Sequence, residues 1–180
     1  IGAAQFGARH AATNSVEDIA KAAEYAHRYG AKVYATLNTL IFDDELEDAK
    51  VQAEALVAAG VDALIVQDMA YCRMGLNVPL HASTQTACST VEQVCFFEQV
   101  GFERAILERN LSGKEIETIC RDTNVEIEAF VHGAICVCHS GRCYLSRSMS
   151  ERSGNRGQCS QPCRLPYDLT DGNGNIYIKG

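Results

Sequence analysis

The sequence lacks the features that mark membrane and secreted proteins. No apolar run approaches the roughly 20 residues that a bilayer-spanning helix needs, so no membrane partner is expected. The apolar start, Ile1 to Ala4, is not preceded by the basic segment of a secretory leader. We therefore predict a cytoplasmic protein. An initiating Met is also missing, and we expect this chain to be a piece of a longer protein.

Two common hydrolase signatures are absent as well. The sequence has no Gly-x-Ser-x-Gly turn, which would expose a serine nucleophile, and no His-Glu-x-x-His helix, which would hold a catalytic zinc. A cysteine nucleophile near His132 or His139 stays open. Cleavage of a peptide substrate is therefore kept as an alternative.

Positive charge is scarce overall but concentrated in one segment. The net charge of -7 argues against a uniformly basic nucleic-acid-binding surface. Residues 139–166 nevertheless carry five arginines against one acid, Glu151, which gives +4 there and leaves -11 for the remainder. The five are Arg142, Arg147, Arg152, Arg156 and Arg164. An anionic partner is expected to bind at this segment.

Strands and helices alternate along most of the chain. The spacing of apolar residues predicts helices over 15–29, 43–59, 89–100 and 112–122. Apolar, β-rich runs predict strands over 32–37, 61–66, 80–83, 104–107 and 125–131. Ser89 and Ser112, each followed three residues later by Glu, predict capping boxes. Such alternation implies an α/β fold with parallel strands and right-handed crossovers.

Both an open doubly wound sheet and a (β/α)8 TIM-type barrel fit this alternation. Polar residues follow nearly every predicted strand, which favours a partial barrel whose strand ends meet at one mouth. We take residues 1–132 as that partial barrel, 133–166 as a Cys- and Arg-rich loop segment, and 167–180 as the start of a β-rich extension. The extension is predicted to begin with a β-hairpin that turns at Asp171 to Gly174.

The residues at the predicted mouth are candidates for catalysis. They are Asp68, Gln85, Glu108, Arg109 and His132, with Asn38, Gln67 and Thr84 beside them, and His10 at the first strand. Their functional role would be to bind substrate or to position a small-molecule oxygen donor. Equally, each can be a structural hydrogen bond or ion pair, and Asp68 and Glu108 can pair with Arg109.

Cysteines carry the clearest chemical signal. Five of the nine fall within 28 residues, at Cys136, Cys138, Cys143, Cys159 and Cys163. In a reducing compartment such a group indicates metal binding rather than disulfides. Close pairs would suit tetrahedral zinc, whereas the glycines among them allow backbone amides to approach the sulfurs of an iron-sulfur cluster. Cys72, Cys88, Cys95 and Cys120 lie singly in or beside predicted helices and are expected to act as small hydrophobic residues.

Two long motifs resemble those of the peptidase U32 family. The first is Glu-Ala-Phe-Val-His-Gly-Ala-Ile-Cys at 128–136, followed by Gly-Arg-Cys-Tyr-Leu-Ser at 141–146. The second is Gly-Asn-Arg-Gly-Gln-Cys-Ser-Gln-Pro-Cys-Arg at 154–164, and the runs at 6–9 and 37–40 are also similar to the family. The resemblance therefore covers essentially the whole chain.

What this resemblance implies is a barrel with a 4Fe-4S cluster, in a family historically called collagenase-like peptidases. Better-defined members act in oxygen-independent hydroxylation of a tRNA uridine, a ribosomal RNA cytidine or a ubiquinone precursor. The carried-over ligands are Cys136, Cys143 and Cys159. A fourth lies past Gly180 in several members, and Cys163 is the local substitute.

Hydroxylation of RNA is the leading hypothesis, because the five arginines beside the cysteines can hold a phosphate backbone. Residues 155–159 and 164–167 look slightly more like the ribosomal RNA members than the quinone members. Peptide cleavage, quinone-precursor hydroxylation and a zinc-stapled binding module without catalysis remain as alternatives.

Overall fold

The computed structural model describes residues 1–8 and 13–180, so Arg9 and His10 lie outside the described residues. Five short strands form the main sheet: β1 (Tyr34–Leu37), β2 (Ala63–Val66), β3 (Leu80–Ala82), β4 (Arg104–Ile106) and β5 (Glu126–Glu128). Helix α1 (Val16–His27) precedes them, and α2 (Leu46–Ala58), α3 (Val91–Val100) and α4 (Gly113–Asp122) connect them. Short 3-10 turns follow the first three strands: η1 (Asp43–Glu45), η2 (Met69–Arg73) and η3 (Thr84–Thr86).

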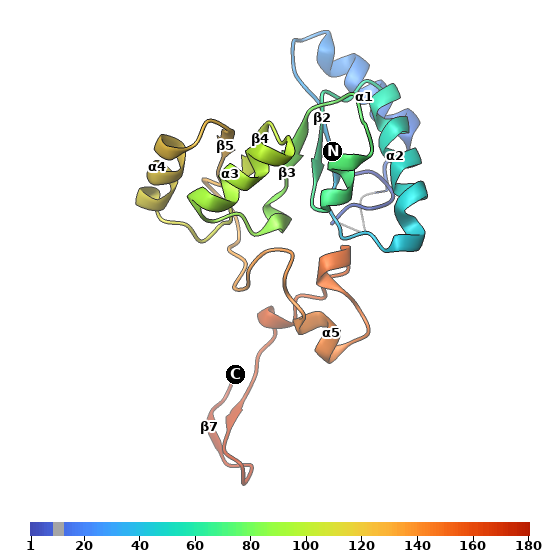
Figure 1. Ribbon diagram of the computed structural model, residues 1–180. Coiled ribbons are helices and arrows are strands. Elements are labelled where there is room, and N and C mark those ends of the chain that lie inside the picture. The colour runs from blue at the N-terminus through green and yellow to red at the C-terminus, as the bar shows by residue number, and fades with distance from the viewer. Residues whose placement is uncertain (9–12) are drawn as a thin grey trace.

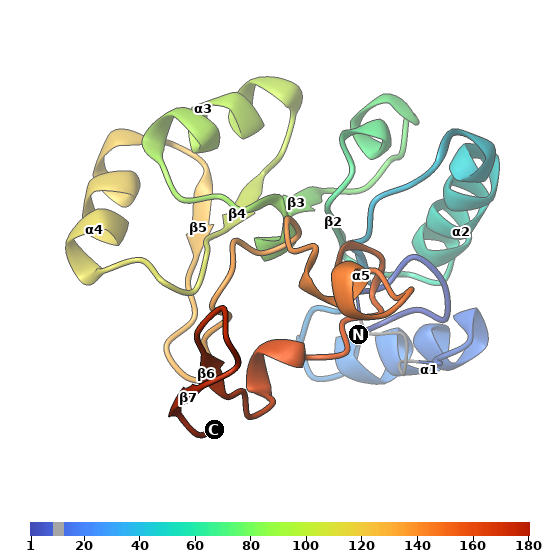
Figure 2. The ribbon, with the colours of Figure 1, turned by 90° about the horizontal axis from the view of Figure 1, so that it is seen from below.

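The strands are all parallel and follow one another in chain order, β1-β2-β3-β4-β5. A doubly wound sheet reverses its strand order at a switch point, whereas a (β/α) barrel adds each strand beside the preceding one. The sheet is therefore consistent with a partial TIM-type barrel, as the sequence predicted. Figure 2 shows the sheet as an arc, with α1 to α4 around its outer side.

Apolar residues fill the space between the arc and the helices. From the sheet, Leu64 and Val66 are fully buried, and from the helices Ile19, Ala53 and Leu56 meet them in one cluster. Successive side chains of a strand point to opposite faces of the sheet. Every second strand residue therefore points to the inner face of the arc, away from the helices.

The inner face carries polar and charged side chains. Arg104 donates to Glu126 (2.8 Å) and to Glu128 (3.0 Å) on the neighbouring strand. Its guanidinium also lies over the ring of Tyr34, 5.1 Å from the centroid, and that ring meets His81 edge to face at 4.9 Å. This face has the character of a polar barrel interior.

Most of the predicted element boundaries are confirmed. Ser15 and Ser112 cap α1 and α4 through full capping boxes, as their spacing to Asp18 and Glu115 requires. The capping box predicted at Ser89 was wrong by one residue. Thr90 is the N-cap of α3, because its hydroxyl accepts from the Gln93 amide while the Gln93 side chain accepts from Ser89.

The last strand is shorter than predicted. Pairing ends at Glu128, and Val131 is fully exposed. Of the single cysteines, Cys88 is completely buried, as expected of a small hydrophobic residue, whereas Cys120 lies exposed on α4, contrary to that expectation. No helix within residues 1–8 and 13–180 is long and apolar enough to cross a membrane.

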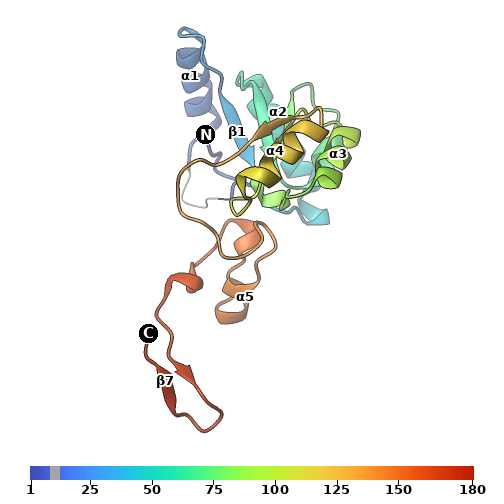
Figure 3. The same ribbon diagram turned by 90° about the vertical axis from the view of Figure 1, so that its left-hand side faces the viewer.

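After β5 the chain continues as irregular backbone, which lies below the sheet in the view of Figure 1. Residues 133–166, the Cys-rich segment, contain only the short helix α5 (Leu145–Met149) and two 3-10 turns, η4 (Gly154–Arg156) and η5 (Pro162–Arg164). The predicted hairpin follows as antiparallel β6 (Leu169–Thr170) and β7 (Ile176–Ile178). In Figures 1 and 3 the hairpin extends away from the sheet, with the Cys-rich segment between them.

Candidate functional site

The Cys-rich segment is anchored where β4 ends by Glu108. The side chain of this residue is only 2% exposed. One carboxylate oxygen accepts from the amide of Ser140 at 2.8 Å, and the other lies 3.0 Å from Nδ1 of His139. A buried carboxylate is stable only when it is paired in this way. Glu108 therefore fixes the backbone that runs between Cys138 and Cys143.

Two glycines let the segment approach the sheet more closely than other residues could. A Cβ at Gly141 would lie 1.9 Å from the carbonyl oxygen of Gln85 and 2.6 Å from Nε2 of Gln67. At Gly157 a Cβ would lie 2.5 Å from the carbonyl oxygen of Gly7. Both glycines have positive φ, of 72° and 79°. The contacts with η3 and with the N-terminal segment therefore require glycine.

Asn155 connects a candidate ligand to the loop after β1. Its side chain is buried, and Oδ1 accepts from the backbone amide of Cys143 at 3.1 Å. The carbonyl oxygen of Asn155 accepts from the amide of Leu40 at 3.3 Å. The backbone of Cys143 is thus positioned by a residue twelve places further along the chain.

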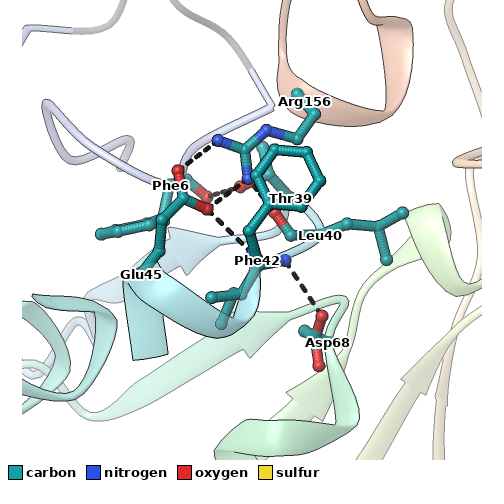
Figure 4. Close-up of polar contacts among 8 residues, drawn as sticks. Phe6, Thr39, Leu40, Phe42, Glu45, Asp68 and Arg156 are labelled. Atoms are coloured by element: carbon teal, nitrogen blue, oxygen red, sulfur yellow. Dashed lines mark hydrogen bonds and ion pairs between the residues drawn. The ribbon is translucent and has the colours of Figure 1, made fainter. Parts of the chain in front are cut away.

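Arg156 clamps the segment to η1, as Figure 4 shows. Its guanidinium binds both carboxylate oxygens of Glu45 (2.5 and 2.6 Å) and donates to the carbonyl of Leu40 (2.7 Å). It also lies 4.3 Å from the ring centroid of Phe42. The Arg156 hydrogen bonds hold the pKa of Glu45 below its usual value. In the same view Asp68 accepts from the amide of Ile41 at 3.0 Å.

A cavity of about 1010 Å³ lies between the segment and the carboxyl ends of the strands. Asn38, Ser83, Thr84 and Gln85 line it from the sheet side. All five clustered cysteines line it from the other side: Cys136, Cys138, Cys143, Cys159 and Cys163. The fold therefore brings the five thiols to one hollow at the mouth.

The cysteines are close but not yet arranged as ligands. Burial raises the pKa of the Cys138 thiol, and a hydrogen bond with Cys143 raises it further. The Ser146 hydroxyl lies 3.9 Å from the sulfur of Cys159. Within the described residues, no three His, Cys, Asp or Glu side chains are already placed to hold a metal ion. The donor set suits a thiolate-bound metal, and four of the five thiols lie on segments outside helices and strands.

The predicted mouth residues fall into three groups. Gln85 and Arg109 line the cavity, with Arg109 stacked on Phe130 at 4.7 Å. Asp68 and Glu108 instead hold loops in place, Asp68 by capping η2 through the Ala70 amide. Among the described residues Arg109 joins no ion pair, so the alternative in which it pairs with Asp68 or Glu108 was wrong. His132 is exposed and is not among the residues that line the cavity.

The arginines differ in how far they are already engaged. Arg147 donates to the carbonyl of Glu151, and Arg164 donates to the carbonyl of Ile135. Arg142 and Arg152 are exposed and form no ion pair with any described residue. Arg156 is engaged in the clamp. Of these five, Arg142 and Arg152 are therefore the least engaged within the described residues.

Sequence reasoning missed the residues that dock the segment, above all Asn155, Ser140 and Glu45. Their partners lie far away in the chain, and each residue type is common on surfaces. The one available signal was the glycines at 141 and 157, which mark close backbone approach.

Comparison with known proteins gives consistent matches. The family model described as "Peptidase family U32" matches residues 1–178. A 23S rRNA 5-hydroxycytidine C2501 synthase from Escherichia coli K12 is 50% identical over 177 residues, which are 98% of this chain and 27% of that protein. The tRNA hydroxylation protein P1 of Bacillus subtilis is 39% identical over 187 residues, all of this chain and 44% of that protein. The chain thus spans less than half of either relative.

A solved structure supports the fold. The structure described as that of the U32 peptidase Mk0906 aligns with a TM-score of 0.59 at 17% identity, over 72% of this chain and 58% of that one. At that identity the likeness concerns the arrangement of strands and helices alone.

Proposed function

The chain belongs to peptidase family U32, and from this membership and the cysteine-lined cavity we propose that it is the cluster-binding part of an enzyme that hydroxylates RNA. The proposed substrate is a ribosomal RNA cytidine or a tRNA uridine, since the relative at 50% identity is named for hydroxycytidine synthesis in 23S rRNA and the relative at 39% identity for tRNA hydroxylation. The observation that carries the proposal is the convergence of five thiols at the mouth of the sheet. We expect the protein to act in the cytoplasm, where such RNAs are found.

The proposed ligands are Cys136, Cys143 and Cys159, with Cys163 as the fourth. All four line the same cavity, and a Cβ at Gly154 would lie 3.6 Å from the carbonyl of Cys143 and 3.7 Å from Cβ of Cys159, so these two residues flank one glycine. A 4Fe-4S cluster held there would supply electron transfer or a binding point for a small-molecule oxygen donor. Zinc bound by the same thiols is the alternative cofactor.

The protein side of the site has two tasks. Gln85 and Arg109 line the cavity from the sheet and are proposed to bind the substrate or the oxygen donor. Glu108 and Asp68 are proposed to act as positioning residues, because their carboxylates hold the loops that carry the ligands and the mouth. His132 has no proposed role in binding, since it lies exposed outside the cavity lining.

The RNA backbone is proposed to contact Arg142 and Arg152, whose guanidinium groups are exposed. Arg147 and Arg164 donate to carbonyl oxygens that do not neutralise them, so they can also attract phosphate. Arg156 is left out of this surface, because its charge is matched by Glu45.

A peptidase is the alternative from another class, and the family name is its main support. Such an enzyme needs a nucleophile hydrogen-bonded to a base. Among the described residues no serine hydroxyl or cysteine sulfur hydrogen-bonds a histidine ring, and the ring of His139 is paired with Glu108 instead. Hydroxylation of a quinone precursor would use the same cavity and is distinguished by the product alone.

The test begins with anaerobic reconstitution of the full-length protein and measurement of iron, sulfide and visible absorption. We expect stoichiometric iron and sulfide, lost in Cys136→Ala, Cys143→Ala and Cys159→Ala. The matched control is Cys120→Ala, which removes an exposed thiol from α4, away from the cavity lining.

The second step compares hydroxylated nucleosides by mass spectrometry in ribosomal RNA and tRNA from wild-type and deletion cells. A hydroxycytidine or hydroxyuridine that disappears on deletion and returns only with the intact cysteines supports the proposal. Stoichiometric zinc without sulfide would overturn it and favour a binding module or hydrolase.

A further inference from the structure

A second hollow adjoins the cysteine-lined cavity. Its volume is about 660 Å³, and it lies between η2, α3 and the Cys-rich segment. Gln85, Gly141 and Tyr144 line both hollows. A nucleic-acid strand that enters the cysteine-lined cavity would therefore bring a nucleotide near the reacting one to this second hollow.

Three aromatic residues line the second hollow; Phe97 is buried, and the rings of the other two are at least half exposed or nearly so. Phe96 on α3 is 49% exposed, and Tyr144, just before α5, is 70% exposed. Exposed rings are common on this surface, but these two come from separate segments and line the same hollow. Nucleobases stack on such rings whatever their sequence.

The polar groups in the second hollow show what kind of base would fit. Gln67 is 7% exposed and its Oε1 has no hydrogen-bond partner, although Nε2 donates to the carbonyl of Gly141 at 3.4 Å. A buried acceptor without a donor is costly, and the exocyclic amino group of cytosine, adenine or guanine would supply one. Uracil lacks an exocyclic amino group and offers only N3–H, which lies between two carbonyl oxygens, so the amino-bearing bases are expected to be preferred.

The charged residues that line the second hollow favour a phosphate group on one side of it. Arg142 lines it with an exposed guanidinium that forms no ion pair among the described residues. Glu92 also lines it and disfavours phosphate near the start of α3. The backbone of the nucleotide would therefore run along the Arg142 side.

We propose that this second hollow binds one unpaired, amino-bearing nucleotide next to the nucleotide held in the cysteine-lined cavity. The base stacks on Phe96 and Tyr144, its amino group donates to Gln67, and its phosphate pairs with Arg142. This inference rests on the proposed RNA substrate, and it assigns that substrate a single-stranded flank of defined base chemistry.

The experiment measures binding of fluorescent single-stranded oligocytidylate and oligouridylate to the full-length protein by anisotropy. Wild-type protein is expected to bind oligocytidylate more tightly. Phe96→Leu and Tyr144→Leu should each weaken binding about tenfold, within the range for loss of one stacking ring. Arg142→Gln should lower the salt slope of the logarithm of affinity by about 0.7, the value for one phosphate of a single strand.

Matched controls remove the same groups elsewhere. Tyr29→Leu takes away a ring that is 73% exposed beyond α1, and Arg121→Gln takes away an exposed charge on α4. Both should leave affinity and salt slope unchanged. Equal affinity for the two oligonucleotides, or pocket variants that bind like the controls, would overturn the inference.

Iron and sulfide content separates this inference from the proposed function. Pocket variants that keep their cluster and still bind RNA normally refute the second hollow while the hydroxylase proposal stands. Wild-type protein with a cluster but no affinity for RNA of either kind refutes both.

Discussion

Replacing Gly141 by alanine should detach the Cys-rich segment from the sheet. Gly75 offers a matched control, because its φ of 70° is nearly the same as the 72° of Gly141, while a Cβ there would meet nothing within 4 Å. Gly75→Ala therefore reports the backbone strain alone. Any additional effect of Gly141→Ala reports the contact with Gln85 and Gln67.

The size of the effect follows from the distances. A left-handed alanine costs about 1–2 kcal/mol, which is the whole expected effect at Gly75. At Gly141 the new Cβ must move from 1.9 Å to an ordinary 3.4 Å from the Gln85 oxygen, a shift of about 1.5 Å. Such a shift would stretch the 2.8 Å bond from the Ser140 amide to Glu108 beyond hydrogen-bond length.

Loss of a hydrogen bond to that buried carboxylate adds about 1.5–3 kcal/mol. Gly141→Ala should therefore lower the free energy of unfolding by about 2.5–5 kcal/mol, against about 1–2 for Gly75→Ala. The assay is urea unfolding of both variants, together with iron and sulfide content after reconstitution. If Gly141→Ala matches Gly75→Ala in both measurements, the close contact with Gln85 does not anchor the segment.

Three further predictions concern the other contacts. The Arg156 clamp lowers the pKa of Glu45, so the stability that this carboxylate contributes is present above its unfolded pKa of about 4.3 and is lost as the pH falls below that value. In urea unfolding from pH 7 to pH 3, Glu45→Gln should therefore remove part of the acid-dependent loss of stability. An unchanged pH profile would count against the clamp. Asn155→Ala leaves the partly buried Cys143 amide without its acceptor, so stability should fall by about 1 kcal/mol with reduced cluster content. Normal iron and sulfide would mean that Asn155 does not position this proposed ligand. Thr90→Ala should lower the free energy of unfolding by about 1 kcal/mol through loss of the α3 cap. An equal effect of Ser89→Ala would mean that Thr90 is not the N-cap of α3.

The elements of the fold were predictable because their determinants are local. Ser112 and Glu115 are three residues apart, and that spacing alone specifies the start of α4. The error at α3 has a local cause too: Ser89 and Thr90 are both good caps, and the choice depends on Gln93 bonding to Ser89. Strand order followed from the short connections between successive strands.

Of the candidate site, only the gathering of the cysteines was predictable from the sequence. Clustering of Cys136 to Cys163 indicated one metal centre, and the fold does bring these residues to one cavity. Their docking was not predictable, because an arginine that pairs with a distant carboxylate looks the same in sequence as one that binds phosphate. Arg156 and Arg142 are such a pair: one meets Glu45, 111 residues away, and the other is free of ion pairs among the described residues. Likewise nothing local distinguishes Glu108 as an anchor from Glu108 as a catalytic acid.

The clamp also bears on the order in which the Cys-rich segment docks during folding. Contacts between residues 111 to 116 positions apart, such as those of Arg156 with Glu45 and Leu40, carry a large loop-closure entropy and form after local helices and neighbouring strand pairs. Asn155, which positions Cys143, precedes Arg156 directly and docks through the same loop. Any metal centre built on Cys143 and Cys159 would therefore be assembled on a sheet that has already folded.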